Sequence, residues 1–146
     1  MVQRSEKTFY CQFAGWTYMN CSFSFEDIFF LLIITLKCVD KKFEKAQNRT
    51  KKFLDLWLIV DGKLETHDFA QAFVTLTEGA NEAIKALSRI KNNSIESPVF
   101  DEVLVASSQR GKKISSIALG QPSGDKIKDV LAQLLRNLFN YSLENE

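Results

Sequence analysis

The sequence predicts a mainly α protein: an irregular antiparallel bundle of about four helices with an N-terminal β-hairpin. Apolar residues recur at three- and four-residue steps over 66–90 and 125–139, which is the period of a helix. Residues near the N-terminus alternate with period two, as in strands. The 146 residues contain no linker-like stretch. We therefore expect one domain over 1–146, with a hairpin at 8–24 and a helical core at 25–142; α+β is the alternative class.

The hairpin is expected from Thr8 to Ser24. Apolar residues alternate with polar ones over Phe9 to Phe13 and again over Met19 to Phe25, and Ala14-Gly15 lies between the two runs. Two strands alone are only marginally stable. The hairpin must therefore pack against the rest of the chain or against a second chain.

A long helix is expected from Ser24 to Val60. Ser24 and Asp27 resemble a capping box, and the apolar run Ile28 to Leu36 follows directly. Unbroken, this helix would be about 55 Å long, so a kink is expected near Cys38 to Lys41. Whether 57–65 is the end of this helix or a short hairpin stays open.

Three further helices are expected: Thr66 to Ile90, Val99 to Gln109 after the cap Ser97-Pro98, and a last one over Asp125 to Phe139. The segment Lys112 to Leu119 is ambiguous. The apolar stripes of these helices predict a core made of Phe29, Leu32, Leu36, Phe43, Phe73, Leu76, Ile84, Leu87, Val103, Leu131, Leu134, Leu135 and Leu138.

The composition excludes several classes of protein. With 19 Lys and Arg against 18 Asp and Glu, the net charge is +1, so no global charge marks a nucleic-acid or membrane binder. The longest apolar run has nine residues, whereas a bilayer requires about 20, so no transmembrane segment is expected. Three cysteines cannot all pair within one chain, and the N-terminus lacks the layout of a signal peptide. We therefore expect a cytoplasmic protein.

No arrangement of residues supports a catalytic, metal or cofactor site. His67 is the only histidine, and Asp68 beside it on a helix is directed about 100° away. No cysteine pair has the spacing of a zinc site. The segment Gly120 to Lys126 lacks the pattern of a phosphate-binding loop and is interpreted as a turn and helix cap. The expectation leans against an enzyme and includes no cofactor, although a site made only of carboxylates stays open.

The strongest functional signal is a basic segment. Residues 37–54 contain seven basic and two acidic residues, a net charge of +5. On a helical wheel, five of the basic residues share one face and are the predicted partner-binding residues: Lys37, Lys41, Lys45, Arg49 and Lys52.

The sequence therefore favours an intracellular helical protein-interaction module, such as an adaptor, a small complex subunit or an inhibitor-type protein. Its partner would be a protein bound through the basic face or through the aromatic end of the hairpin. Binding of nucleic acid by the same basic face is the alternative. The sequence leaves the oligomeric state open.

Overall fold

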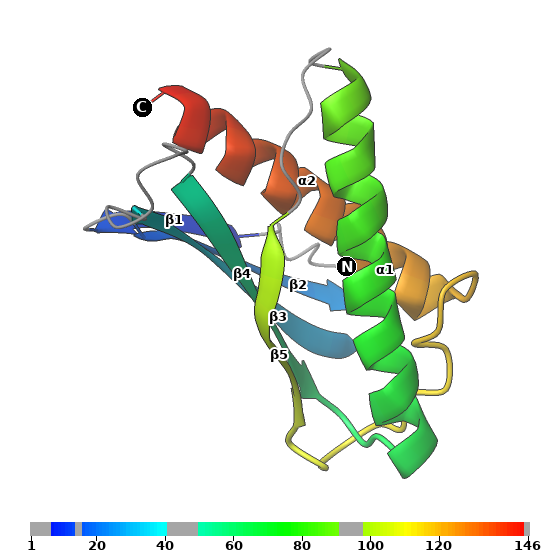
Figure 1. Cartoon of the computed structure of the whole chain (residues 1–146). Coiled ribbons are helices and arrows are strands. Elements are labelled where there is room, and N and C mark those ends of the chain that lie inside the picture. The colour runs from blue at the N-terminus through cyan, green and yellow to red at the C-terminus, as the bar shows by residue number, and fades with distance from the viewer. Residues whose placement is uncertain (1–6, 14–15, 41–49, 91–97, 145–146) are drawn as a thin grey trace.

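The computed structural model describes residues 7–13, 16–40, 50–90 and 98–144, and it shows a five-stranded mixed sheet with two helices (Figure 1). The strands lie in the order β1-β2-β3-β4-β5. In chain order the elements are β1 (Lys7–Phe13), β2 (Trp16–Phe25), β3 (Ile28–Asp40), β4 (Thr50–Asp61), α1 (Thr66–Ile90), β5 (Val99–Ser107) and α2 (Pro122–Glu144).

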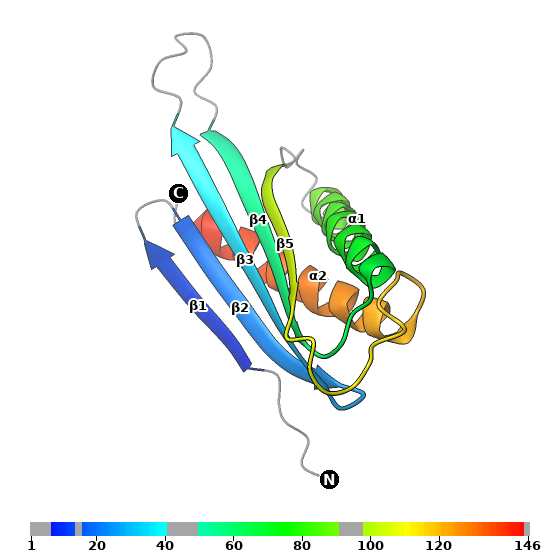
Figure 2. The same cartoon turned by 90° about the horizontal axis from the view of Figure 1, so that it is seen from below.

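Both helices lie on the same side of the sheet. Strands β1 to β4 form an antiparallel meander, and α1 connects β4 to β5, which pairs parallel to β4. Helix α2 crosses β2 and β3, while α1 packs on α2 and beside β5. Figure 2 looks onto the opposite side of the sheet, where no described element lies. We call the side under the helices the inner face and the opposite side the outer face.

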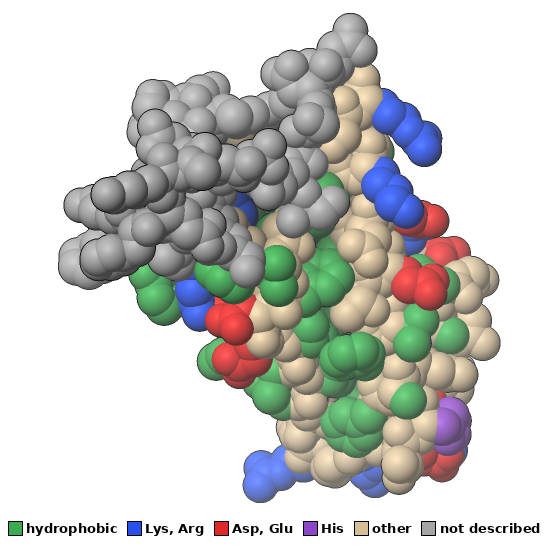
Figure 3. All heavy atoms as spheres, in the orientation of Figure 1, with side chains coloured by type: hydrophobic (Ala, Val, Ile, Leu, Met, Phe, Trp, Pro, Cys, Tyr) green, Lys and Arg blue, Asp and Glu red, His purple; other side chains and the backbone are tan. Residues whose placement is uncertain are grey.

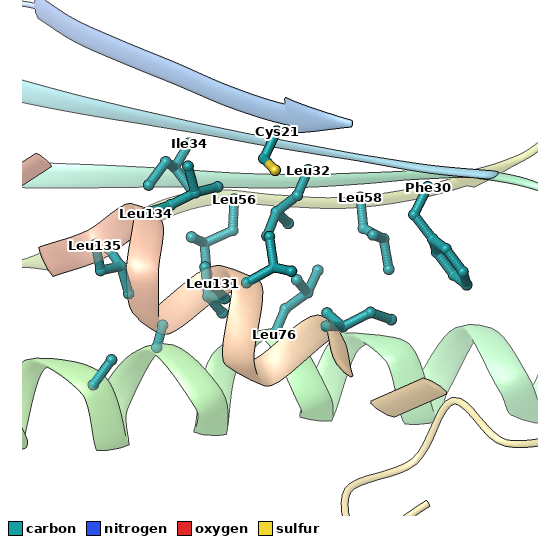
Figure 4. Close-up of a cluster of buried hydrophobic side chains, with 14 of the residues drawn as sticks. Cys21, Phe30, Leu32, Ile34, Leu56, Leu58, Leu76, Leu131, Leu134 and Leu135 are labelled. Atoms are coloured by element: carbon teal, nitrogen blue, oxygen red, sulfur yellow. The ribbon is translucent and has the colours of Figure 1, made fainter. Parts of the chain in front are cut away.

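The hydrophobic core fills the space between the inner face and the helices. The even-numbered residues at 28–36 of β3 and 54–60 of β4, such as Leu32 and Leu58, are buried, and so are Leu76 of α1 and Leu131 of α2. Figure 4 shows these side chains converging from the sheet and from both helices. The alternation along each strand thus decides which residues the helices cover.

The predicted mainly α class and the helical core at 25–142 are wrong, because most of Ser24 to Val60 forms strands. β3 and β4 pair antiparallel from Phe29↔Asp61 to Asp40↔Thr50. What resembled a capping box is a two-residue hairpin turn, in which Glu26 and Asp27 have φ of 51° and 63°. Positive φ at both central residues is typical of a type I′ turn, whose twist matches the flanking strands. The α+β alternative describes the fold better.

The helix expected over Val99 to Gln109 is also wrong, because β5 occupies Val99–Ser107. β-Branched residues at three of its nine positions favour a strand beside β4. Residues 57–65 form neither a helix end nor a local hairpin. β4 continues to Asp61, and Lys63 then bridges to Lys113.

The two longest amphipathic patterns are confirmed as helices. α1 begins at the predicted Thr66 and contains the whole predicted stripe to Ile90, the helix end expected near 91–93 lies outside the described residues, and α2 contains the predicted 125–139. β1 and β2 pair antiparallel where alternation predicts the hairpin. No helix in the described part of the chain is long and apolar enough to span a membrane.

The predicted core is right at ten of its thirteen positions in the sense that their side chains are buried or partly buried. Phe29 and Phe73 are wrong, since they are 39% and 47% exposed. Phe29 is an odd residue of β3 and lies on the outer face, and Phe73 lies beside the buried stripe of α1 that contains Ala72 and Leu76. Phe43 lies outside the described residues.

Candidate interaction surface

The outer face carries a strip of apolar side chains. Strand pairing places Ile33 beside Trp57, Leu31 beside Ile59, and Leu104 of β5 on the other side of Trp57. We call these five residues the outer apolar strip. Ile59 and Leu104 are 36% and 37% exposed, and the other three are half-buried. Each would lose further contact with water if a partner covered this face.

Trp57, in the middle of the outer apolar strip, has a hydrogen-bond donor without an acceptor. Its Nε1 is buried, and no described residue accepts a hydrogen bond from it. A buried donor without an acceptor costs about 1–3 kcal/mol.

A β-bulge brings three carboxylates together where β5 begins. Leu54 pairs with Phe100 and Asp55 pairs with Glu102, so Asp101 is an extra residue in β5. Asp101 and Glu102 therefore both lie beside Asp55 of β4. Figure 3 shows acidic side chains along β5 in this region.

Lys37 of β3 binds two of these carboxylates. Its Nζ lies 2.9 Å from Asp55 Oδ2 and 3.3 Å from Asp101 Oδ2, and 4.5 Å from the centre of the Trp16 ring. The hydrogen bond to Asp55 raises the pKa of Lys37, against an opposing effect of desolvation. Lys37 is therefore a cation at neutral pH.

We call Lys37, Asp55, Asp101 and Glu102 the acidic corner. One positive and three negative groups give it a net charge of −2. Asp55 is only 8% exposed, and its Oδ1 is buried without a hydrogen-bond partner among the described residues. The acceptors of the acidic corner that a partner can reach are therefore the carboxylates of Asp101, whose side chain is 52% exposed, and of Glu102, which is exposed.

A second polar cluster lies at the start of α1. His67 Nε2 lies 3.2 Å from Asp68 Oδ1, and its Nδ1 lies 3.6 Å from Glu65 Oε2. The expectation that His67 and Asp68 diverge is wrong, because the 100° step separates only their Cβ directions and the side chains still meet. Ligand atoms of Glu65, His67 and Asp68 are close enough to hold a metal ion. However, Lys113 already pairs with Glu65, and Asp68 accepts the backbone N–H of Glu65 at 2.9 Å.

The predicted basic face is not a helical face in the described residues. Lys37 lies on β3 in the acidic corner, and Lys52 lies on β4 with its Nζ 5.8 Å from the Phe139 ring of α2. Lys41, Lys45 and Arg49 lie outside the described residues. The structure therefore separates Lys37 from Lys52, and partner binding by these five residues stays a prediction.

The segment before α2 is a turn and helix cap, as predicted. Asp125 Oδ1 accepts the backbone N–H of Gly120 at 2.9 Å, and the N–H of Gly124 binds Ser116 O at 2.9 Å. These groups are therefore engaged within the chain. A Cβ on Gly124 would lie 1.9 Å from Ala118 O, so this close approach requires glycine.

The outer apolar strip and the acidic corner were not among the predicted site residues. The available signal was the alternation Phe53, Asp55, Trp57, Ile59 against four buried aliphatic residues in β4. The helical interpretation of this segment concealed it. The bulge that adds Asp101 is a property of strand pairing and has no signal in one sequence.

Comparison with known proteins identifies no family for this chain. No family model matches it, and no curated protein or solved structure shows significant similarity. The fold alone does not imply a function.

Proposed function

We propose that this chain is a protein-interaction module that binds another protein through the outer face of its sheet. The observation that carries the proposal is the composition of β3. Its first nine residues, Ile28 to Leu36, are all apolar except Thr35. Strands covered on one face alternate apolar and polar residues, whereas strands covered on both faces have continuous apolar runs. The described helices cover only one face, so a partner on the other would account for this composition.

The size of the outer face fits a stable protein complex. Five strands about 4.8 Å apart, each contributing about nine residues at about 3.3 Å, span on the order of 700 Å². Specific complexes bury about 800 Å² on each partner. The half-buried Trp57 lies near the centre of this area, where buried aromatic anchors contribute most to affinity.

The described residues give the nucleic-acid alternative no support. Lys37 is held by Asp55 and Asp101, and Lys52 lies near the Phe139 ring on the helix side of the sheet. A phosphate backbone would also meet the negative acidic corner on the outer face. A protein partner fits this surface better, and we keep the cytoplasm as the expected compartment.

Site-specific photocrosslinking in the native cells tests the proposal. A benzophenone amino acid replaces Phe29 on the outer face in one variant and Phe73 on α1 in the other. The two positions form a matched pair, because both are phenylalanines, 39% and 47% exposed. We expect a specific protein to be cross-linked from position 29 and not from position 73.

A second matched pair tests whether the outer face provides the binding energy. Ile59→Asp places a charge in the outer apolar strip, and Val74→Asp makes the same change on α1, at 36% and 45% exposure. Cross-linking from position 29 should be lost with Ile59→Asp and kept with Val74→Asp. Leu104→Ser replaces Ile59→Asp if circular dichroism shows that the latter is unfolded. Equal cross-linking from positions 29 and 73, or full cross-linking in both aspartate variants, would refute the proposal.

A further inference from the structure

We propose that the partner of the outer face is a different protein, which places an arginine side chain against Asp101 and Glu102 in the acidic corner. This inference rests on the proposed function. It follows from the charges that any partner must cover when it binds this face.

The acidic corner has more negative charge than its own lysine can neutralise. Lys37 already contacts Asp55 and Asp101 at 2.9 and 3.3 Å. Glu102 is exposed and has no ion pair or hydrogen bond with a described residue. The side chain of Asp101 is 52% exposed, so both carboxylates of β5 are accessible to a partner.

Binding through the outer face would remove water from these carboxylates. Charged groups that lose water are costly unless an opposite charge replaces it with good hydrogen-bond geometry. A purely apolar partner would leave the acidic corner with its net charge of −2. The partner must therefore supply positive charge at this position, and the outer apolar strip supplies the remaining contact area.

The arrangement of the carboxylates favours arginine over lysine. Asp101 and Glu102 are adjacent at the bulge, beside Asp55. A guanidinium has five N–H donors in a planar fork and can bind two carboxylates at once, whereas an ammonium acts as a compact point charge. One arginine would reduce the net charge of the acidic corner from −2 to −1.

A second copy of this chain does not supply this group from its own outer face. The arginines in the described part of the chain are Arg89 in the last turn of α1, Arg110 after β5 and Arg136 on α2. Arg110 lies beyond the end of β5 opposite to the acidic corner. A second copy would instead bring another acidic corner, so the charge pattern favours a different protein.

The probe in this experiment is the partner protein that is cross-linked from position 29. It is produced in recombinant form. Its affinity is measured by titration calorimetry for the wild-type chain and for Asp101→Asn/Glu102→Gln. We expect the dissociation constant to rise at least tenfold. Glu78→Gln/Asp129→Asn makes the same charge change on the exposed sides of α1 and α2, and it should leave the constant within twofold.

A charge exchange then tests the arginine itself. Glu102→Arg should weaken binding further, and changing the cross-linked protein's arginine to glutamate should restore it. Unchanged affinity in Asp101→Asn/Glu102→Gln, together with loss of binding in Ile59→Asp, would overturn this inference and leave the proposed function intact. A cross-link between two copies, supported by a dimer in sedimentation that Ile59→Asp abolishes, would also overturn it. Absence of any cross-link from position 29 would refute both proposals.

Discussion

Leu32 and Ile33 are neighbours in β3 whose replacement by alanine should have very different costs. Leu32 is fully buried, and Figure 4 shows its side chain directed from the sheet toward the helices. Leu32→Ala leaves a cavity in a packed core and should cost about 3.5 kcal/mol. Ile33 is half-buried on the outer face. Ile33→Ala removes three half-buried side-chain carbons, and a fully buried carbon contributes about 0.8 kcal/mol. With some loss of β propensity in the strand, the total cost should be about 1.5 kcal/mol.

Urea denaturation followed by far-ultraviolet circular dichroism measures both free energies of unfolding. For a chain of this size 1 kcal/mol shifts Tm by about 2–4 °C, so Leu32→Ala should lower Tm by about 10 °C and Ile33→Ala by about 4 °C. The two variants should rank in the opposite order for partner binding, because only Ile33 belongs to the outer apolar strip. Equal losses of stability would refute the assignment of the two faces, since a shift of register by one residue exchanges them.

Three other predictions test separate parts of the structure. Gly124→Ala should lower the urea midpoint strongly, because the new Cβ would lie 1.9 Å from Ala118 O. Phe73→Ala should change the free energy of unfolding by less than about 1 kcal/mol, because Phe73 is 47% exposed. Replacing a buried phenylalanine costs about 3–5 kcal/mol. Lys113 lowers the pKa of Glu65, mainly through a hydrogen bond. This pair therefore stabilises the fold above the unfolded pKa near 4.5, and the contribution is lost as the pH falls through the lower folded pKa. Carboxyl NMR titration should give Glu65 a midpoint below 4.5 in the wild type and a higher one in Lys113→Gln.

The two helices could be predicted because their burial is one-sided. In α1 the residues Ala72, Leu76 and Ala80 are fully buried at steps of four, with Thr75 and Gly79 buried beside them, while Phe73, Val74 and Glu78 on the other side are exposed. A pattern of this kind has one structural explanation. The same holds for β2, where Met19, Cys21 and Phe23 are buried and alternate with more exposed residues.

β5 could not be recognised in the same way because none of its nine residues is fully buried and their exposure does not alternate regularly. Its bulge also breaks the alternation, so Asp101 and Glu102 follow each other between Phe100 and Val103. A Ser-Pro pair before it imitates the start of a helix. Pairing with residues of β4 that lie 46 or 47 positions earlier in the chain decides its structure, and one sequence carries no record of that partner.

The reason why the sequence of β3 predicts a helix bears directly on function. An apolar run that only Thr35 interrupts has no clear period, so residues 28–36 fit a buried helix and a strand covered on both faces equally well. The turn at Glu26 and Asp27, with both φ positive, decides for the strand. Once β3 is a strand, the apolar side chains of Leu31 and Ile33 on the outer face have no cover among the described elements. The apolar composition that makes the sequence of β3 ambiguous is therefore the same property that supports a docked partner. Measuring both stability and partner binding in Ile33→Ala separates the contribution of Ile33 to binding from its contribution to stability.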